Sequence, residues 1–145
     1  MAGFKWLHLS ALTALTLASA SSPHPADASA CNLSKTLALL RQGQTQSVEG
    51  DKAHGVDTQV AAAREAWICY QDRNQSSTIR GNMGKASADI LNGAAQDADA
   101  IGNGPKALRL ALQALSEYKT LARDRTIPLQ VRVYADSAAQ AASSP

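Results

Sequence analysis

Aromatic residues are scarce in this sequence. Its 145 residues include one phenylalanine, two tryptophans and three tyrosines, and Phe4 and Trp6 both lie near the N-terminus. Without many rings, a core has to be built from alanine, leucine, isoleucine and valine, which favours closely packed helices. Such a core buries a modest apolar area, so a covalent cross-link would add useful stability.

Strong charge of one sign and long apolar runs are also missing. The chain has 14 lysines and arginines against 12 aspartates and glutamates, a formal net charge of +2, and the cations are scattered. This balance argues against a nucleic-acid partner. No stretch reaches the roughly 20 apolar residues that a membrane-spanning helix needs, so we expect no transmembrane segment.

Catalytic and cofactor motifs are lacking as well. His54 is the only histidine after Ala30, and no nucleophile is marked beside a base and an orienting group. The stretch from Gly81 to Ser87 resembles a phosphate-binding loop only in part, because Ile79 and Ala86 replace its first glycine and its hydroxyl residue. We therefore expect no bound cofactor.

The N-terminus has the three zones of a secretory signal peptide. Lys5 supplies the early positive charge, an uncharged run of apolar and small residues extends from Leu7 to Ala20, and small-residue cleavage signatures follow. We expect cleavage after Ala30, with cleavage after Ala20 as the alternative. Residues 1–30 are then the signal peptide and 31–145 a single helical domain, located in the periplasm or secreted.

Two cysteines, Cys31 and Cys69, follow the predicted signal peptide. An exported protein enters an oxidising compartment, so we expect them to form a disulfide. An antiparallel helical hairpin would bring the start of a first helix beside the end of a second. The alternative is a lipoprotein anchored through Cys31, although Ala28 and the early end of the apolar run depart from the usual lipid-attachment pattern.

Helical periodicity predicts an all-α fold, a small bundle of four to five helices arranged as antiparallel hairpins. The second helix, apolar nearly all round, is expected at the centre of the fold. The expected helices are Leu33–Gln46, Asp57–Arg73, Ser77–Ile101, Ala107–Ala122 and Thr126–Ala142, and the last of these also shows strand-like alternation.

Several local features accompany these helices. We expect Asn32 or Ser34 to cap the first helix, Asp57 the second and Thr126 the last. The glycine-containing stretch 43–55 is expected to be a loop, and a break or kink is expected in the third helix near Asn92 and Gly93. The fourth helix should bury its apolar residues and expose its polar ones, Glu117 included. The expected apolar face is Leu108, Ala111, Leu112, Leu115, Tyr118 and Ala122.

Two groups of residues are candidate sites. Arg64, Trp67, Tyr70 and Arg73 step by three along the second helix and, if exposed, would form a cationic and aromatic strip for an anionic or sugar-like partner. The alternative is that Trp67 and Tyr70 belong to the core. In the stretch before that helix, Asp51, His54 and Asp57 could hold a metal, or could be a solvated polar segment.

The sequence therefore favours an exported, non-enzymatic helical module that binds another protein or an envelope component, without specifying an oligomeric state. A small cell-envelope hydrolase that uses carboxylates is the alternative activity. Glu65 and Glu117 are the residues whose replacement would test it.

Overall fold

The computed structural model describes residues 31–144, and the predicted signal peptide lies outside this range. Helices account for most of these residues and strands for none of them, which confirms the all-α prediction and shows that the last segment is a helix from Leu129 onward. The helices are α2 (Leu33–Val48), α3 (Lys52–Gln71), α4 (Ser77–Ala100), α5 (Gly104–Arg123) and α6 (Leu129–Ser143).

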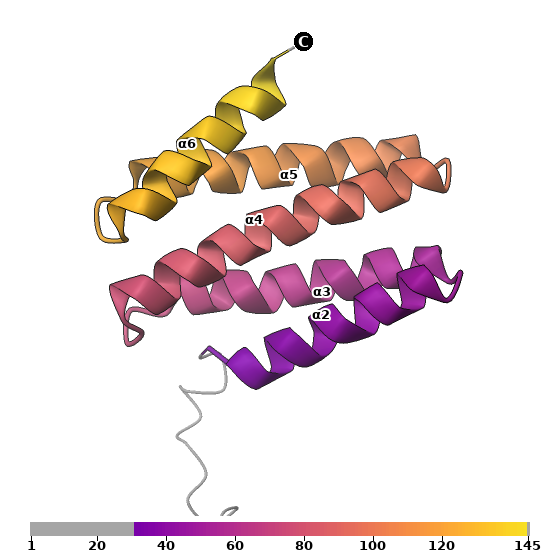
Figure 1. Ribbon diagram of the computed structural model, residues 1–145, viewed down its shortest axis with the longest axis horizontal. Helices are drawn as coiled ribbons and strands as arrows, with labels where there is room; N and C mark the ends of the chain where they lie inside the picture. Colours follow the sequence, from indigo (N-terminus) through magenta and orange to yellow (C-terminus); the bar gives the residue numbers. More distant parts are fainter. Residues whose placement is uncertain (1–30, 145) are drawn as a thin grey trace, which may run out of the picture. The chain divides into compact units, whose positions relative to one another are not determined.

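The helices form two layers of antiparallel neighbours. Each helix packs against the next one along the chain, and α4 also contacts α6. Figure 1 shows α2, α4 and α6 slanting the same way in one layer, with α3 and α5 behind them. Since α4 packs against α3, α5 and α6, it is the central helix. The prediction that the second helix (α3) would be central is wrong, because α3 packs chiefly on its two sequence neighbours, α2 and α4.

Short polar side chains begin most of the helices. Asn32, Asp51, Ser76 and Asn103 each accept a hydrogen bond from the backbone N–H three residues later, as N-caps do. Asn32 is therefore the predicted cap of the first helix. The predicted cap Asp57 is wrong, because the N-cap of α3 is Asp51, six residues earlier.

The last helix, by contrast, begins later than predicted. Pro128 precedes Leu129 at the start of α6, and no side chain caps this end. The predicted cap Thr126 instead stays in the α5–α6 connection, where its hydroxyl donates to Asp124 at 2.6 Å. The hydroxyl also accepts from Arg80, so it is committed to tertiary contacts.

The stretch 43–55 is helical at both ends, and its prediction as a loop is wrong. Only residues 49–51 connect α2 to α3. Gly43 and Gly55 lie where these helices cross, and a Cβ on Gly43 would come within 2.9 Å of Gln59 and 3.2 Å of the Gly55 carbonyl. These glycines therefore allow close helix contact instead of ending the helices.

The predicted break near Asn92 and Gly93 is also wrong, because α4 continues from Ser77 to Ala100. Tertiary packing along this 24-residue helix outweighs the cost of its glycines, roughly 1 kcal/mol each. Gly84 is one reason why α4 packs closely, since a Cβ there would meet the side chains of Leu121 and Tyr70.

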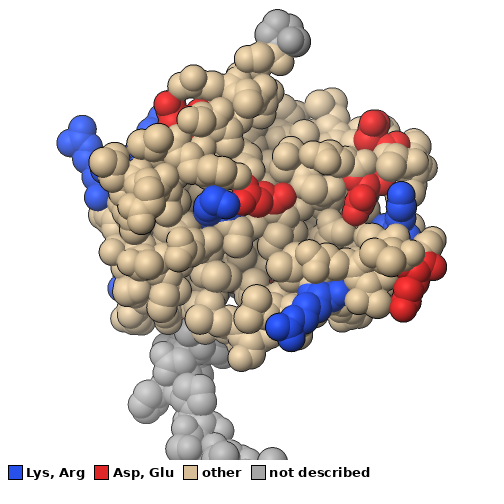
Figure 2. Space-filling view, in the orientation of Figure 1, with Lys and Arg blue, Asp and Glu red and all other residues tan. Residues whose placement is uncertain are grey.

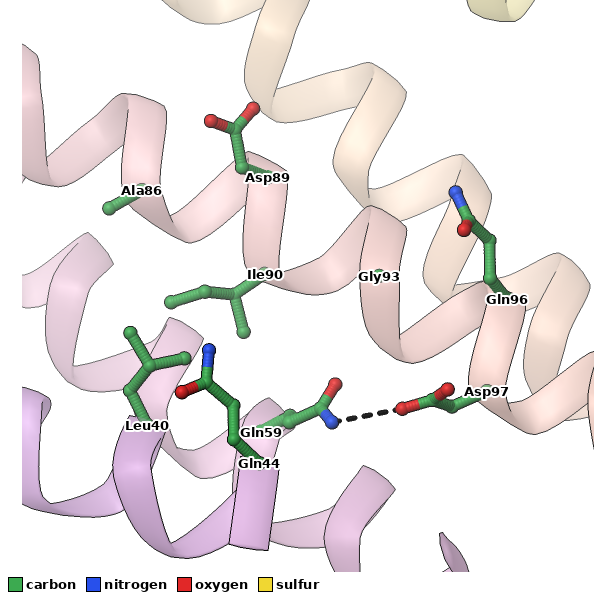
Figure 3. Close-up of a pocket in the computed structure, with 9 residues that line it drawn as sticks. All are labelled: Leu40, Gln44, Gln59, Ala86, Asp89, Ile90, Gly93, Gln96 and Asp97. Carbon is green, nitrogen blue, oxygen red and sulfur yellow. Dashed lines mark hydrogen bonds between the residues drawn. The ribbon is translucent and has the colours of Figure 1, made fainter. Parts of the chain in front are cut away.

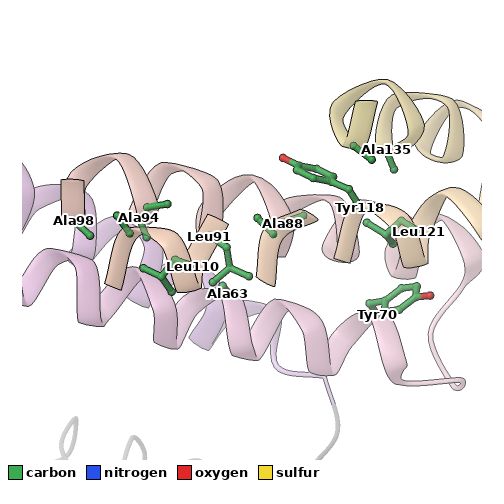
Figure 4. Packing of buried hydrophobic residues seen from close by; sticks show 14 of the residues in the cluster. Ala63, Tyr70, Ala88, Leu91, Ala94, Ala98, Leu110, Tyr118, Leu121 and Ala135 are labelled. Atoms are coloured by element: carbon green, nitrogen blue, oxygen red, sulfur yellow. The ribbon is translucent and has the colours of Figure 1, made fainter. Parts of the chain in front are cut away.

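Alanine dominates the core, as the composition predicts. More than half of the buried apolar residues are alanines, and they let the helix axes approach closely. The larger side chains fill the spaces between helices (Figure 4). Those labelled there are Tyr70, Leu91, Leu110, Tyr118 and Leu121.

The predicted apolar face of α5 is only partly right. Tyr118 is buried, but Leu108 and Leu112 are exposed, and Glu117, expected to be exposed, is buried. The face that packs on α4 is rotated from the predicted one, because the neighbouring helices decide which side is covered. It consists mainly of Ala107, Leu110, Ala114, Glu117 and Leu121.

Cys31 and Cys69 form the predicted disulfide. It joins the residue that leads into α2 to the last turn of α3, and Cys69 is fully buried. Next to it, the backbone N–H of Cys31 donates to Asp72 at 3.3 Å. Within the described range, no helix is long and apolar enough to cross a membrane.

A candidate binding groove between α2 and α4

A groove opens between α2 and α4 on the side that carries α2, α4 and α6. Its volume is about 510 Å³, which lies in the range of ligand sites in proteins. Most of this side of the molecule is uncharged (Figure 2). The groove is lined by Leu40, Gln44, Gln59, Ala86, Asp89, Ile90, Gly93, Gln96 and Asp97 (Figure 3).

The α2 wall is a row of side chains at helical spacing. Leu40 and Gln44 line the groove, and residues 33 and 37 continue the same row at intervals of three and four. Leu33 is 40% exposed and Leu37 is 52% exposed. Of all the residues of α2, only Thr36 and Gly43 are buried. The row therefore presents leucines to the open space instead of to the core.

The α4 wall has a matching row formed by Ala86, Ile90, Gly93 and Asp97. Leu40 and Ile90 point into the space between the two helices (Figure 3). A Cβ built on Gly93 would meet no atom within 4 Å, unlike one on Gly84. Gly93 thus leaves open volume in the groove, and its lack of a side chain is not required for packing.

The deep end of the groove is polar. Gln59 of α3 donates to the Asp97 carboxylate at 3.0 Å (Figure 3) and to the Ser47 hydroxyl at 3.2 Å. Ser47 donates to the same carboxylate at 3.3 Å. The described residues place no cation in an ion pair with Asp97, so only neutral groups hold its charge. A positive group on a ligand would complement it.

Asp89, at the rim of the groove, links three helices. Its carboxylate accepts from Tyr118 at 2.6 Å, Tyr134 at 2.8 Å and Lys85 at 2.7 Å. Burial and the bond to Asp89 raise the pKa of Tyr118, and the bond to Asp89 raises the pKa of Lys85. With these donors in place, Asp89 holds α4 against α5 and α6 and forms a rigid edge.

Comparisons with known proteins give no relative for this chain. No family model, no curated protein and no solved structure matches it.

The predicted cationic and aromatic strip on α3 is divided between core and surface. Tyr70 is buried, and its hydroxyl donates to Asp124 at 2.8 Å. Its ring lies 4.5 Å from that of the half-buried Trp67, centroid to centroid. Arg64 and Arg73 are exposed, and Arg73 donates to Thr126. These positions favour the alternative in which the aromatic residues pack in the core and the arginines lie at its edge.

The predicted metal residues have other partners. Asp51 caps α3 and accepts from His54 Nδ1 at 2.9 Å, while Asp57 forms an ion pair with Lys106 of α5. Between residues 31 and 144, no group of three or more histidine, cysteine, aspartate or glutamate side chains is placed to hold a metal ion. The three residues are thus spread over a helix start and a contact between helices.

Glu117 forms a buried polar cluster that the sequence did not indicate. Its Oε2 lies 2.6 Å from the Ser87 hydroxyl, which also lies 2.9 Å from the Ala63 carbonyl. A hydroxyl has only one proton to donate. If Ser87 donates to Ala63, the contact with Glu117 needs a proton on the carboxyl group. Burial raises the pKa of Glu117, which favours this protonated form.

We expect the Glu117→Gln variant to be more stable than the wild type at neutral pH and equally stable near pH 4. The unfolded carboxyl ionises near its ordinary pKa of 4.5, while the folded one holds its proton to higher pH. The native state then binds more protons, so the free energy of unfolding falls as pH rises from 4.5 to the folded pKa. The free energy of unfolding falls by about 1.4 kcal/mol for each pH unit that separates the folded pKa from the unfolded one.

Urea unfolding at several pH values between 4 and 8 measures this difference. Glutamine keeps a donor for Ser87 and removes the titration. If the Glu117→Gln variant is less stable than the wild type by the same amount at every pH, the carboxyl group of Glu117 is not protonated in the folded protein.

Proposed function

We propose that this protein is an exported, non-enzymatic binding module that holds a segment of another protein in the groove between α2 and α4. The observation that carries the proposal is the pair of facing rows, with Leu40 on one wall and Ile90 on the other. The space between them is open because Gly93 has no side chain. Apolar walls with a few placed polar groups are typical of binding sites.

The lining specifies what the bound segment should carry. An apolar side chain would fit between Leu40 and Ile90, since burying it removes apolar area from water on both partners. A lysine or arginine on the same segment would pair with Asp97. The exposed amides of Gln44 and Gln96 offer donors and acceptors for the peptide backbone. The expected occupant is an apolar segment with a nearby cation.

The disulfide supports the export part of the proposal. Structural disulfides persist in oxidising compartments, and the chain begins with the pattern of a signal peptide. The lipoprotein alternative requires the Cys31 sulfur to carry a lipid. A sulfur bonded to Cys69 is not free to do so.

The carboxylates named for a hydrolase have structural partners. Glu65 forms an ion pair with Lys35 at 2.6 Å, and Glu117 is enclosed in the core beside Ser87. An enclosed acid cannot reach a polymeric substrate. This arrangement favours binding over hydrolysis.

Gly93 supplies a direct test. Wild-type protein is used to enrich peptides from a displayed random library, and each enriched peptide is then measured against Gly93→Leu and Gly93→Ala. Leucine should fill the groove and weaken binding at least tenfold. The alanine variant should still bind and should be about 0.5–1 kcal/mol more stable, because alanine favours a helix and nothing lies within 4 Å of its Cβ.

The selected sequences provide a second readout. We expect them to share an apolar residue with a neighbouring lysine or arginine. Recovery of no enriched peptide, or equal binding to wild type and Gly93→Leu, would contradict a groove that binds peptides.

A further inference from the structure

The solvent-facing side of α5 carries an apolar row that is largely exposed. Leu108 is 63% exposed and Leu112 is 56% exposed, and Leu115, half-buried against the core, continues the row one turn later. At about 100° per residue, these three positions lie away from the buried side of α5 that contains Leu110 and Leu121. Leucines spaced by four and three residues form the usual contact row of a helix that packs against another helix.

The same side of α5 is positively charged. Lys119 and Arg123 follow the leucines along the helix, and Arg109 lies next to Leu108 near the start of α5. None of the three forms an ion pair with another described residue. Glu117, the only acid of α5, is buried in the core. The leucines thus lie in the first half of α5 with Arg109 beside them, and Lys119 and Arg123 make the surface cationic near the end of the helix.

Two hollows shape the cationic end. One has a volume of about 330 Å³ and is bordered by Leu112, Leu115, Lys119 and Arg123, among other residues of α5. The other, about 310 Å³, lies between α5 and α6 and shares Lys119 and Arg123. Asp136 on α6 borders this second hollow and accepts from Gln140 at 2.8 Å. Concave spaces of this size accept individual side chains.

We propose that this surface docks an acidic amphipathic helix of another protein, antiparallel to α5. The partner's apolar face would cover Leu108, Leu112 and Leu115. Its acidic N-terminal turns would meet Lys119 and Arg123, where the positive N-terminal end of its dipole would also oppose the negative end of α5. This surface is distinct from the groove between α2 and α4 and does not depend on it.

Two other occupants fit the observations less well. A second copy would bring the same cations of both chains into one interface without acids to pair with them, which opposes association. A lipid bilayer would attract the cations, but its surface has no projecting side chains to enter the two hollows. Charge and shape together favour an acidic helix.

A designed pair of peptides tests the proposal. The first is an 18-residue helix with leucines along one face and glutamates in its first two turns, and its twin has lysines in place of the glutamates. Wild-type protein should bind the glutamate peptide at least tenfold more tightly than the lysine twin, as measured by fluorescence anisotropy. The K119E/R123E variant should reverse this preference, and Leu112→Gln should weaken binding of the glutamate peptide at least fivefold.

Matched controls make the result specific. R41E/R64E changes the net charge by the same amount on α2 and α3 and should leave the preference unchanged. Gly93→Leu should also have no effect, which separates this surface from the groove. The absence of binding by the glutamate peptide, an equal response to R41E/R64E, or tighter binding to phosphatidylglycerol vesicles than to either peptide would overturn the proposal.

Discussion

Replacing Arg80 by alanine is expected to lower the free energy of unfolding by about 3–5 kcal/mol, the usual cost of removing one partner from a buried ion pair. The Arg80 side chain is 6% exposed and lies 3.4 Å from Asp124. It also donates to the Tyr70 carbonyl at 2.9 Å and to the Thr126 hydroxyl at 3.0 Å. Without it, the charge of Asp124 remains in a largely buried position with only neutral donors.

The same cluster explains why the effect should extend beyond one contact. Arg80 belongs to α4, Tyr70 to α3, and Asp124 to the connection between α5 and α6, so a single guanidinium joins three parts of the fold. Burial and the hydrogen bond to Asp124 raise the pKa of Tyr70 to about 12. Its hydroxyl therefore stays protonated and continues to donate.

Urea unfolding followed by circular dichroism measures the effect of Arg80→Ala. Arg64→Ala on the exposed side of α3 is the matched control and should change the free energy of unfolding by less than about 0.5 kcal/mol. If the two variants lose similar stability, the cluster does not hold these helices together.

Removing the disulfide by the double change Cys31→Ala and Cys69→Ala is expected to lower stability by about 4 kcal/mol. The bond closes a loop of 38 residues, and in the chain-entropy model a loop of that length restricts the unfolded chain by this amount. The loss of stability should be largest in α2. This helix buries only Thr36 and Gly43 and packs chiefly on α3, so little else holds its first turns.

Hydrogen exchange separates local from global loss. Amides of α2 should exchange faster in the double variant, while those of α4 and α5 should keep most of their protection. Intact mass of the exported wild type, with and without reduction, provides the control: reduction should add two hydrogens to a chain that begins at the predicted cleavage site. A variant as stable as the wild type would show that the bond is dispensable.

Much of the fold could be predicted because local signals and tertiary packing agree. The third helix was expected to end at Ile101 and the fourth to begin by Ala107, and the glycine, asparagine and proline between these positions separate α4 from α5. The pairing of Cys31 with Cys69 followed from an antiparallel hairpin. In both cases the residue type serves a local or covalent requirement that does not depend on more distant helices.

Glycine shows where this reasoning fails. Gly43 and Gly55 were predicted to lie in a loop and Gly93 to break a helix, yet all three are helical. The first two allow α2 and α3 to approach closely, and the third faces open space. The sequence records only the missing side chain. Whether a neighbouring helix lies opposite is decided by tertiary packing.

The groove could not be predicted for a related reason. Leu40 and Ile90 lie in regular apolar rows that are typical of core faces. One row lies on α2 and the other on α4, and the two become walls of one groove only because α3 holds both helices in the same layer. The exposed row of Leu108 and Leu112 illustrates the same limit, because periodicity indicates an apolar side and not what covers it.

The central claim is that the groove between α2 and α4 is the binding surface. Nuclear magnetic resonance mapping of an enriched peptide on the isotope-labelled mature protein tests this most directly. We predict that the largest chemical-shift changes fall on Leu37, Leu40, Ile90 and Gly93, with little change along the exposed side of α5. Changes centred on α5 or on the exposed arginines of α3, with the α2 and α4 rows unaffected, would contradict it.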